Sequence, residues 1–475
     1  MAPNKRQFEA CHTDTGISKP PLILGLSPTR SLGVPLSMMP DIMHIVANIS
    51  DLLISLWRGN ITCMPTDDID TWDWAVFRDE QIWQDHGHAV EKAGIHLPGS
   101  FDTKPCNIAA KINTDYKMWE FLVYTFALAP GLLENILPDP YWRNLCKLVC
   151  GFQILSQHEV THEEVLQAIV LLSAWEREFE ELYYQRHNDH LHFVRPCVHQ
   201  VLHLGSETFQ KGPDICTTQW TIERMIGNLK QQIRQPSNYL TNFANEGVQR
   251  ARVNALLAAL PHLDDSQHAP PAGAINLTNG YVLLNKSDKH LVYPSHDTAT
   301  AILEFLNHPE PVLKIRHWAQ LLLPNGQIAQ SAWRKELRGA DKLRISCMIK
   351  VGDLRLMLHS TEHFQFKSDD TILFGEVIYF TRLVIGNAED MWFANVTLVR
   401  MFSHLDAEIL RASYSTVPRC EATDMIRIVE IRNIISVVGM IPTHNGQGFF
   451  VVEKPGLSVS HFTGEEGVMN DNDVD

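Results

Sequence analysis

Residues 41–59, DIMHIVANISDLLISLWRG, contain the strongest secondary-structure signal in the chain. Asp41 is a suitable helix N-cap, and Gly59 is a suitable stop. Between them, apolar residues recur at intervals of three and four, which places them on one face of an α-helix. These residues are Ile42, Ile45, Val46, Ile49, Leu52, Leu53 and Leu56. The stretch therefore predicts a buried amphipathic helix.

The pattern stays helical as far as Pro261. We expect helices over about 114–129, 140–156, 162–186 and 190–204, and two more in TTQWTIERMIGNLKQQIR and EGVQRARVNALLAAL. A linker, PHLDDSQHAPPAG, and a short helix near 297–307 follow. From about Leu343, β-branched and aromatic runs alternate with turn signals. This change of pattern predicts a small β barrel or sandwich.

The predicted fold class is α+β, and 475 residues are enough for more than one core. We divide the chain into an irregular segment 1–40 with one buried strand around Leu22 to Leu26, a mainly helical segment 41–260, a linker with short helices 261–341, a β-rich domain 342–456 and an acidic tail 457–475 that we expect to be disordered.

Composition limits the classes of function. The formal charge of -15 argues against general adhesion to nucleic acid but leaves a local basic surface open. Nine irregularly spaced cysteines favour a reducing, intracellular compartment. The first thirty residues show no secretory signal, and the most apolar segment, 121–133, is too short for a membrane span. We therefore expect no membrane partner.

The five residues from His158 to His162 read H-E-V-T-H, which matches the H-E-x-x-H signature of zinc metalloproteases. That site needs both histidines on one face of a continuous helix. Thr161 and Glu164, however, match a capping box, which would begin a new helix inside the motif. We therefore expect no zinc at His158 and His162.

A second histidine cluster lies in RHNDHLHFVRPCVHQVLHL, residues 186–204. His199 and His203 are four residues apart and could share a helix face, with Cys197 or His192 nearby, which is a spacing used by metal sites. The plainer alternative is a half-buried helix whose histidines bond to backbone or to neighbouring acids.

Two carboxylates are candidates for binding a divalent cation. Asp41 and His44 form Asp-x-x-His at a helix start, where Asp can be a hard oxygen ligand or simply an N-cap. Glu223 lies on a second predicted helix, where Gly227 would leave room beside its carboxylate. We expect the buried side of that helix to consist of Ile222, Met225, Ile226, Leu229 and Ile233.

The surroundings of Glu223 are basic. Between residues 219 and 254, five basic residues stand against two acidic ones, although the whole chain is acidic. The five are Arg224, Lys230, Arg234, Arg250 and Arg252. A basic island around a carboxylate suits a nucleic-acid groove, and a solvated helix face would explain the same composition.

Many segments in succession resemble the C-terminal portion of CACTA-type (EnSpm-like) DDE transposases, of the Plavaka kind found in fungal genomes. They include MPDIMHIVANISDLLISLWRG, KMWEFLVYTFALAPGLL, LPDPYWRNLCKLV, RHNDHLHFVRPCVHQVLHL and CTTQWTIERMIGNLKQQIRQPSN. The later segments FGEVIYF, NVTLVRMFS, IISVVGMIP and FFVVEKPG resemble the tail of those proteins. The resemblance spans roughly residues 15–458.

The resemblance implies a partial RNase H-like core with a large all-α insertion. In that family three carboxylates hold two Mg²⁺ or Mn²⁺ ions, which two-metal sites place about 4 Å apart, for DNA strand cleavage and transfer. Asp41 and His44 match the family's Asp-x-x-His motif, and Glu223 matches its third carboxylate. The implied partners are the DNA of transposon ends and, as an option, further copies of the chain, in the nucleus.

The chain also departs from the family. The first catalytic Asp and the N-terminal zinc- and DNA-binding region would lie well upstream of Asp41, whereas this sequence begins only forty residues before it. We therefore expect a truncated transposase-derived protein that is inactive by itself. The alternative is a non-catalytic DNA- or chromatin-binding protein of transposon origin.

Overall fold

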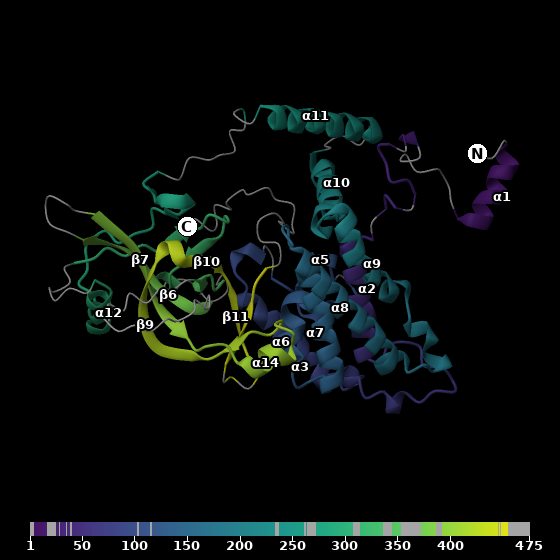
Figure 1. The fold of residues 1–475 in the computed structure, drawn as a ribbon, viewed down its shortest axis with the longest axis horizontal. Coiled ribbons are helices and arrows are strands. Elements are labelled where there is room, and N and C mark those ends of the chain that lie inside the picture. The colour runs from purple at the N-terminus through teal and green to yellow at the C-terminus, as the bar shows by residue number, and fades with distance from the viewer. Residues whose placement is uncertain are drawn as a thin grey trace.

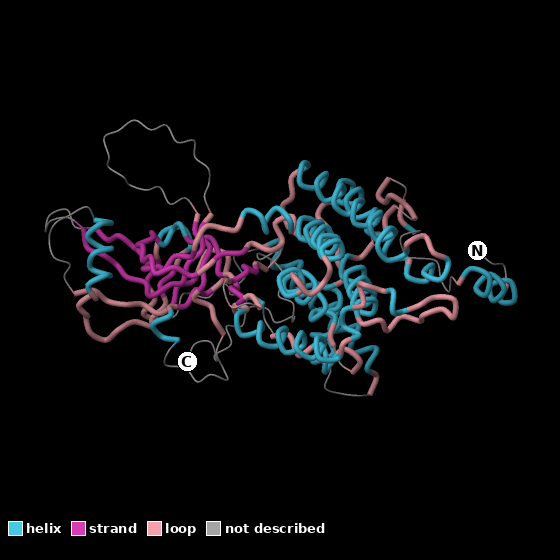
Figure 2. The backbone as a smooth tube through the Cα atoms, turned by 90° about the horizontal axis from the view of Figure 1, so that it is seen from below, coloured by secondary structure: helices cyan, strands magenta, loops and turns pink. Residues whose placement is uncertain are grey.

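The protein has an α+β fold, in which helices form the first half and antiparallel sheets the C-terminal part (Figure 2). The computed structural model describes residues 4–16, 25–27, 29–34, 36–38, 40–101, 104–114, 116–232, 237–260, 263, 272–306, 314–335, 344–352, 372–385, 392–444, 446 and 448–454. None of the described helices is long and apolar enough to cross a membrane.

Eleven α-helices are described before residue 260. They are α1 (Lys5–Thr15), α2 (Ile42–Trp57), α3 (Glu80–Ala93), α4 (Ile108–Lys111), α5 (Met118–Val123), α6 (Ala129–Leu132), α7 (Asp139–Leu155), α8 (His162–Phe179), α9 (Pro196–Lys211), α10 (Trp220–Gln232) and α11 (Tyr239–Ala259). Two π-helical turns, Tyr124–Leu128 and Glu180–Tyr184, join α5 to α6 and extend α8.

The centre of the helical part is α2, whose predicted apolar face is confirmed. All seven residues of that face are buried, and Gly59 adopts a φ of 61° where the chain leaves the helix. Helices α7, α8 and α9 pack on one another in sequence order (Figure 1). The helix expected over 190–204 is displaced: residues 188–193 form a 3-10 turn, and α9 begins only at Pro196, a favourable first helical residue.

No strand is described before Ile275. The strand expected around Leu22 to Leu26 falls largely on residues outside the described ones, and Gly25 and Leu26 are not in a strand. The described part of the first half is therefore helical, without the sheet that an RNase H-like core would contain.

The C-terminal part contains three antiparallel sheets. Strands β1 (Ile275–Asn276), β2 (Val282–Leu283), β3 (Gln320–Leu322) and β4 (Ile328–Gln330) form the first, with α12 (His296–Leu306) and α13 (Ala332–Lys335) nearby in sequence. The second has the order β10-β5-β6-β7-β9, and the third has the order β11-β12-β8. Their bounds are β5 (Met348–Val351), β6 (Leu373–Ile385), β7 (Trp392–Phe402), β8 (Arg419–Cys420), β9 (Ala422–Glu430), β10 (Ile434–Val437), β11 (Gly439–Pro442) and β12 (Phe449–Val452), and α14 (Ala407–Ala412) follows β7.

The five-stranded sheet is strongly bent. Its two edge strands, β9 and β10, are joined by a single 3-10 turn, Ile431–Asn433. In a flat sheet these edges would lie about 19 Å apart, because neighbouring strands are separated by about 4.8 Å. The short connection therefore requires the sheet to curl until its edges approach each other, which is barrel-like.

The helical and β parts share a continuous core. Phe450 and Val452 of β12 belong to the same buried cluster as the helices. Gly131 in α6 lies directly against Phe450, because a Cβ built on Gly131 would come within 2.6 Å of the ring. Arg419 of β8 adds a polar link, since its guanidinium lies 3.0 Å from Glu134 and 2.7 Å from Asp406.

Candidate metal and nucleic-acid site at the start of α2 and α10

Asp41 joins the beginnings of two helices. It is the N-cap of α2, where its Oδ2 accepts from the amide of His44 at 3.4 Å and contacts His44 Nδ1. Its Oδ1 accepts from the Thr218 hydroxyl and from the Gln219 amide, both at 3.0 Å. Thr218 and Gln219 directly precede α10. One carboxylate, only 10% exposed, thus holds together two segments that are far apart in sequence.

Glu223 follows in the first turn of α10. Its backbone amide donates to the Gln219 carbonyl at 2.9 Å, and its side chain is exposed. The fold therefore brings Asp41 to the first turn of the helix that carries Glu223. A helix N-terminus has a partial positive charge, which favours carboxylates at both positions.

Asp41 already has four donors around its two oxygens, which is about the full capacity of a carboxylate. A cation could therefore reach it only if the His44 or Thr218 contact were released. Oxygen ligands of this kind suit Mg²⁺ or Mn²⁺. Among the described residues, no group of three or more His, Cys, Asp or Glu side chains is arranged to hold a metal ion.

The exposed faces of α10 differ from the sequence prediction. Leu229 is buried, but Ile222 is 54% exposed and Met225 is 44% exposed, while Ile233 lies outside the described residues. The prediction of a continuous buried side was wrong because α10 projects from the helical body and contacts mainly α11 (Figure 1). A Cβ at Gly227 would meet no atom within 4 Å, so the space there does not depend on glycine.

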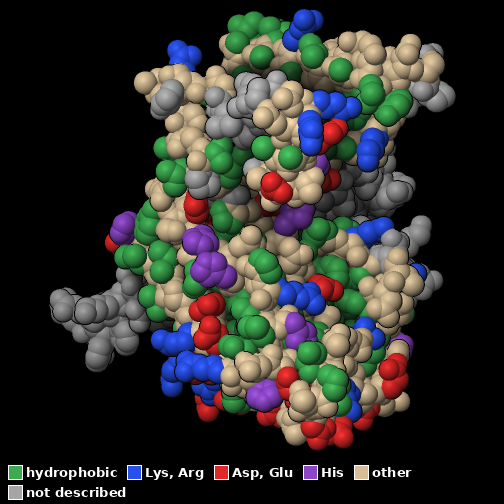
Figure 3. Space-filling view, turned by 90° about the vertical axis from the view of Figure 1, so that its right-hand side faces the viewer, with side chains coloured by type: hydrophobic (Ala, Val, Ile, Leu, Met, Phe, Trp, Pro, Cys, Tyr) green, Lys and Arg blue, Asp and Glu red, His purple; other side chains and the backbone are tan. Residues whose placement is uncertain are grey.

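The predicted basic residues are only partly described. Lys230 and Arg252 are exposed, and Arg250 is half-buried. Arg224 lies in α10 without a described side chain, and Arg234 falls outside the described residues. On the face that Figure 3 shows, the described Lys and Arg side chains form separate groups with Asp and Glu between them. This face therefore has a mixed charge instead of a continuous basic surface.

The H-E-x-x-H motif is divided as the capping box predicted. Thr161 Oγ1 accepts from the Glu164 amide at 3.2 Å, and the Glu164 carboxylate accepts from the Thr161 amide at 2.8 Å. Helix α8 begins at His162, so His158 lies in the preceding turn. The two histidines consequently do not share a helix.

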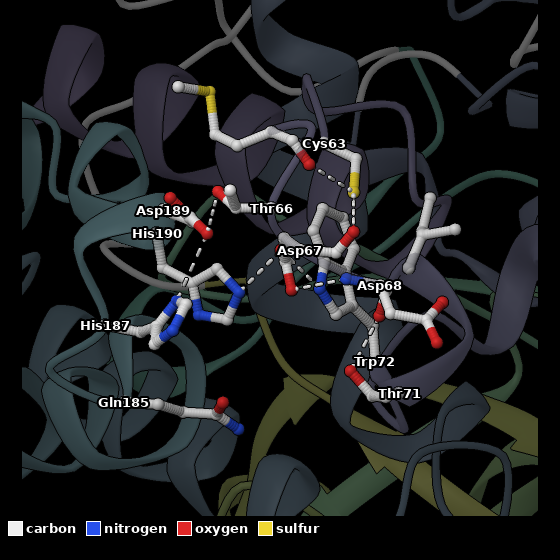
Figure 4. A network of polar contacts seen from close by, with 12 residues as sticks. Cys63, Thr66, Asp67, Asp68, Thr71, Trp72, Gln185, His187, Asp189 and His190 are labelled. Carbon is white, nitrogen blue, oxygen red and sulfur yellow. Dashed lines mark hydrogen bonds and ion pairs between the residues drawn. The ribbon is translucent and has the colours of Figure 1, made fainter.

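A buried contact that the sequence did not predict joins Asp67 to His190 (Figure 4). His190 Nε2 lies 2.9 Å from Asp67 Oδ2, and its Nδ1 lies 3.2 Å from the Tyr184 carbonyl. Trp72 Nε1 donates to the same Asp67 oxygen at 3.1 Å. The side chains of Asp67 and His190 are only 8% and 4% exposed, so this contact joins two distant segments in the interior of the protein.

Residues next to Asp67 and His190 form further contacts between the same two segments. Thr66 donates to Asp189 at 2.6 Å, and His192 Nε2 lies 2.8 Å from the Thr62 carbonyl. Burial raises the pKa of Asp67, but hydrogen bonds from the Asp68 amide and His190 outweigh it and hold that pKa below the usual range. The plainer alternative placed these histidines on a half-buried helix, whereas His190 and His192 lie in the 3-10 turn 188–193. Both rings do contact backbone carbonyls, and the acid that His190 contacts is distant in sequence. An acidic turn and a histidine-rich segment were the available signals, but neither identifies its partner across the chain.

The comparisons with known proteins identify no relative. A scan against models of protein families found no match, and searches of curated proteins and of solved structures found none.

Proposed function

We propose that this chain is a transposase-derived protein, inactive by itself, in which Asp41 and Glu223 supply oxygen ligands of the kind that bind Mg²⁺ or Mn²⁺ for DNA strand cleavage and transfer. The observation that carries this proposal is the bonding of the Asp41 carboxylate to Thr218 and Gln219. Two carboxylates that are far apart in sequence thereby lie at the neighbouring starts of α2 and α10.

Each residue then has a definite role. Asp41 and Glu223 would bind the cation, whose charge would activate water or a DNA 3′-hydroxyl and stabilise the leaving oxygen. His44 would orient Asp41, and Lys230, Arg250 and Arg252 would contact phosphates, with Arg224 and Arg234 in the same role. Helices α3 to α9 would correspond to the helical insertion of an RNase H-like core. No strand is described before Ile275, so this correspondence rests on the helices alone.

A second candidate is non-catalytic DNA or chromatin binding in the nucleus, with or without self-association. It is favoured by the four donors that surround Asp41, because a carboxylate satisfied by its own chain serves as a structural cap without any cation. DNA contact would then depend on the basic residues of α10 and α11 alone.

Mn²⁺ binding followed by electron paramagnetic resonance distinguishes the two. The first candidate predicts saturable Mn²⁺ binding that is at least tenfold weaker in Asp41→Asn and Glu223→Gln, without cleavage of oligonucleotides by this chain alone. Glu163→Gln, which changes an exposed acid in the first turn of α8, is the matched control.

The second candidate predicts DNA binding that falls steeply with salt and is unchanged in Glu223→Gln. Mn²⁺ binding that is identical in the wild type and both site variants would rule out the first candidate. Absence of DNA binding even at low salt would rule out the second.

A further inference from the structure

The histidines of α9 form an arrangement that the proposed function does not use. His199 and His203 are one helical turn apart on α9, and both are exposed. Their Nε2 atoms lie 3.3 Å from each other, and the ring planes are nearly perpendicular, at 82°. The two Nε2 atoms thus lie next to each other at the protein surface.

This separation fits one metal ion. Imidazole nitrogens lie about 2.0–2.1 Å from Zn²⁺. Two nitrogens 3.3 Å apart at that distance subtend an angle of about 104–111° at the ion, which is close to tetrahedral. The neutral rings can donate both lone pairs once each carries its proton on Nδ1. The separation of the two nitrogens therefore suits bonds to one shared ion.

An acidic side chain lies nearby on the neighbouring helix. Glu176 of α8 interacts electrostatically with His199 and with Glu180. Helices α8 and α9 pack side by side, so this carboxylate adds negative charge beside the histidine pair (Figure 1). A negative charge next to the pair favours a cation there.

Other residues expected near this pair are excluded as ligands. Cys197 is buried, only 4% exposed, and His192 Nε2 is bonded to the Thr62 carbonyl. The described residues contain no group of three His, Cys, Asp or Glu side chains arranged for a metal. The site is thus bidentate, and water would complete the coordination shell.

We propose that His199 and His203 form a two-imidazole binding site for a divalent transition-metal ion, Zn²⁺ or Cu²⁺, on the outer face of α9. Imidazole pairs favour these ions over Mg²⁺, and Cu²⁺ binds more tightly than Zn²⁺ in such sites. An ion that bridges one turn ties that turn together, so binding also stabilises the folded chain.

The chain contains its own matched control. His158 and His162 have the same spacing in sequence, but the start of α8 separates them. If spacing alone were sufficient, both pairs would bind metal. If helical geometry is required, only His199 and His203 would.

The test uses the full chain without a histidine tag, loaded with one equivalent of Cu²⁺ and measured by electron paramagnetic resonance, with Zn²⁺ binding measured by calorimetry. We expect a spectrum with two nitrogen ligands and Zn²⁺ affinity that falls at least tenfold in the double variant His199→Gln/His203→Gln. The double variant His158→Gln/His162→Gln should retain both properties. Glu176→Gln keeps both imidazoles and should retain the two-nitrogen spectrum.

Equal metal binding by the wild type and the His199→Gln/His203→Gln variant would overturn the proposal, because the 3.3 Å contact would then be a hydrogen bond between the rings only. Loss of the two-nitrogen spectrum in Glu176→Gln would also overturn it. Asp41 and Glu223 take no part in this readout, so the result is independent of the proposed DNA chemistry.

Discussion

The carboxylate of Asp41 accepts a hydrogen bond from the Gln219 amide at 3.0 Å, across 178 positions of sequence. Asp41→Ala should therefore affect two helices. It removes the N-cap of α2, which typically costs about 0.5–2 kcal/mol, and it releases the start of α10. We expect a lower urea midpoint and faster hydrogen exchange at the amides of Gln219 and Glu223.

The control for this change is Asp79→Ala, which removes the N-cap of α3 without a comparable link to a distant helix. It should lower stability by a similar amount while leaving exchange at Gln219 unchanged. Equal exchange at Gln219 in all three proteins would contradict a tie between α2 and α10.

The buried pair of Asp67 and His190 should be strongly coupled. Removing one partner leaves the other buried without its hydrogen-bond partner, which typically costs about 1–3 kcal/mol. Asp67→Asn and His190→Gln should each be destabilising, and the double variant should lose clearly less than the sum. Urea unfolding of the four proteins of this cycle measures the coupling. Strictly additive losses of unfolding free energy would show that the contact between Asp67 and His190 does not contribute to stability.

The same pair predicts sensitivity to acid. The pKa of Asp67 is lower in the folded protein than in the unfolded chain, so its ionised carboxylate stabilises the folded state. This stabilisation is fully present above the ordinary Asp range near pH 4, and it is lost as the pH falls through the lower pKa of the folded protein. Asp67→Asn should therefore lose less stability than the wild type between pH 5 and pH 2. Parallel pH profiles would contradict this.

His86 should destabilise the protein at mildly acidic pH. Burial lowers its pKa to about 3, with a smaller effect of His444, and its Nε2 lies 2.8 Å from the Tyr124 hydroxyl. The unfolded chain therefore binds a proton that the folded chain does not. Stability should fall by up to about 1.4 kcal/mol per pH unit below pH 6.5, until the folded His86 itself is protonated near pH 3. Unfolding of His86→Gln at pH 7, 6, 5 and 4 should show a smaller slope than the wild type.

Two glycines in helices should respond oppositely to alanine. At Gly131 a methyl group would meet the Phe450 ring at 2.6 Å, so Gly131→Ala should cost about 1–3 kcal/mol. At Gly227 nothing lies within 4 Å, and alanine favours helix by up to about 1 kcal/mol. Thermal unfolding of both variants measures the difference, and a neutral Gly131→Ala would contradict the close packing.

Local signals in the sequence were sufficient for several elements. The spacing of the apolar residues after Asp41 predicted α2, and Thr161 with Glu164 predicted the start of α8, because helix periodicity and capping depend on residues a few positions apart. The strands β6 and β7 likewise follow the expected runs. Each of these signals is contained within one segment.

Long-range relationships were not predictable in the same way. Nothing near Asp67 indicates His190, and nothing near Asp41 indicates Gln219, because a hydrogen bond between distant segments leaves no local pattern. Ile222 and Met225 have helical spacing but remain exposed, since periodicity shows which residues share a face and not whether another element covers it.

The contact of Phe450 with Gly131 has a consequence for dividing the protein into pieces. Residues 449–452 come late in the chain, yet their side chains fill the interior of the helical part. A fragment that ended near residue 260 would leave an apolar hollow beside α6, open to water. The boundary between helical and β-rich sequence is therefore not a boundary between independently folding units, and expression trials should keep β12 together with the helices.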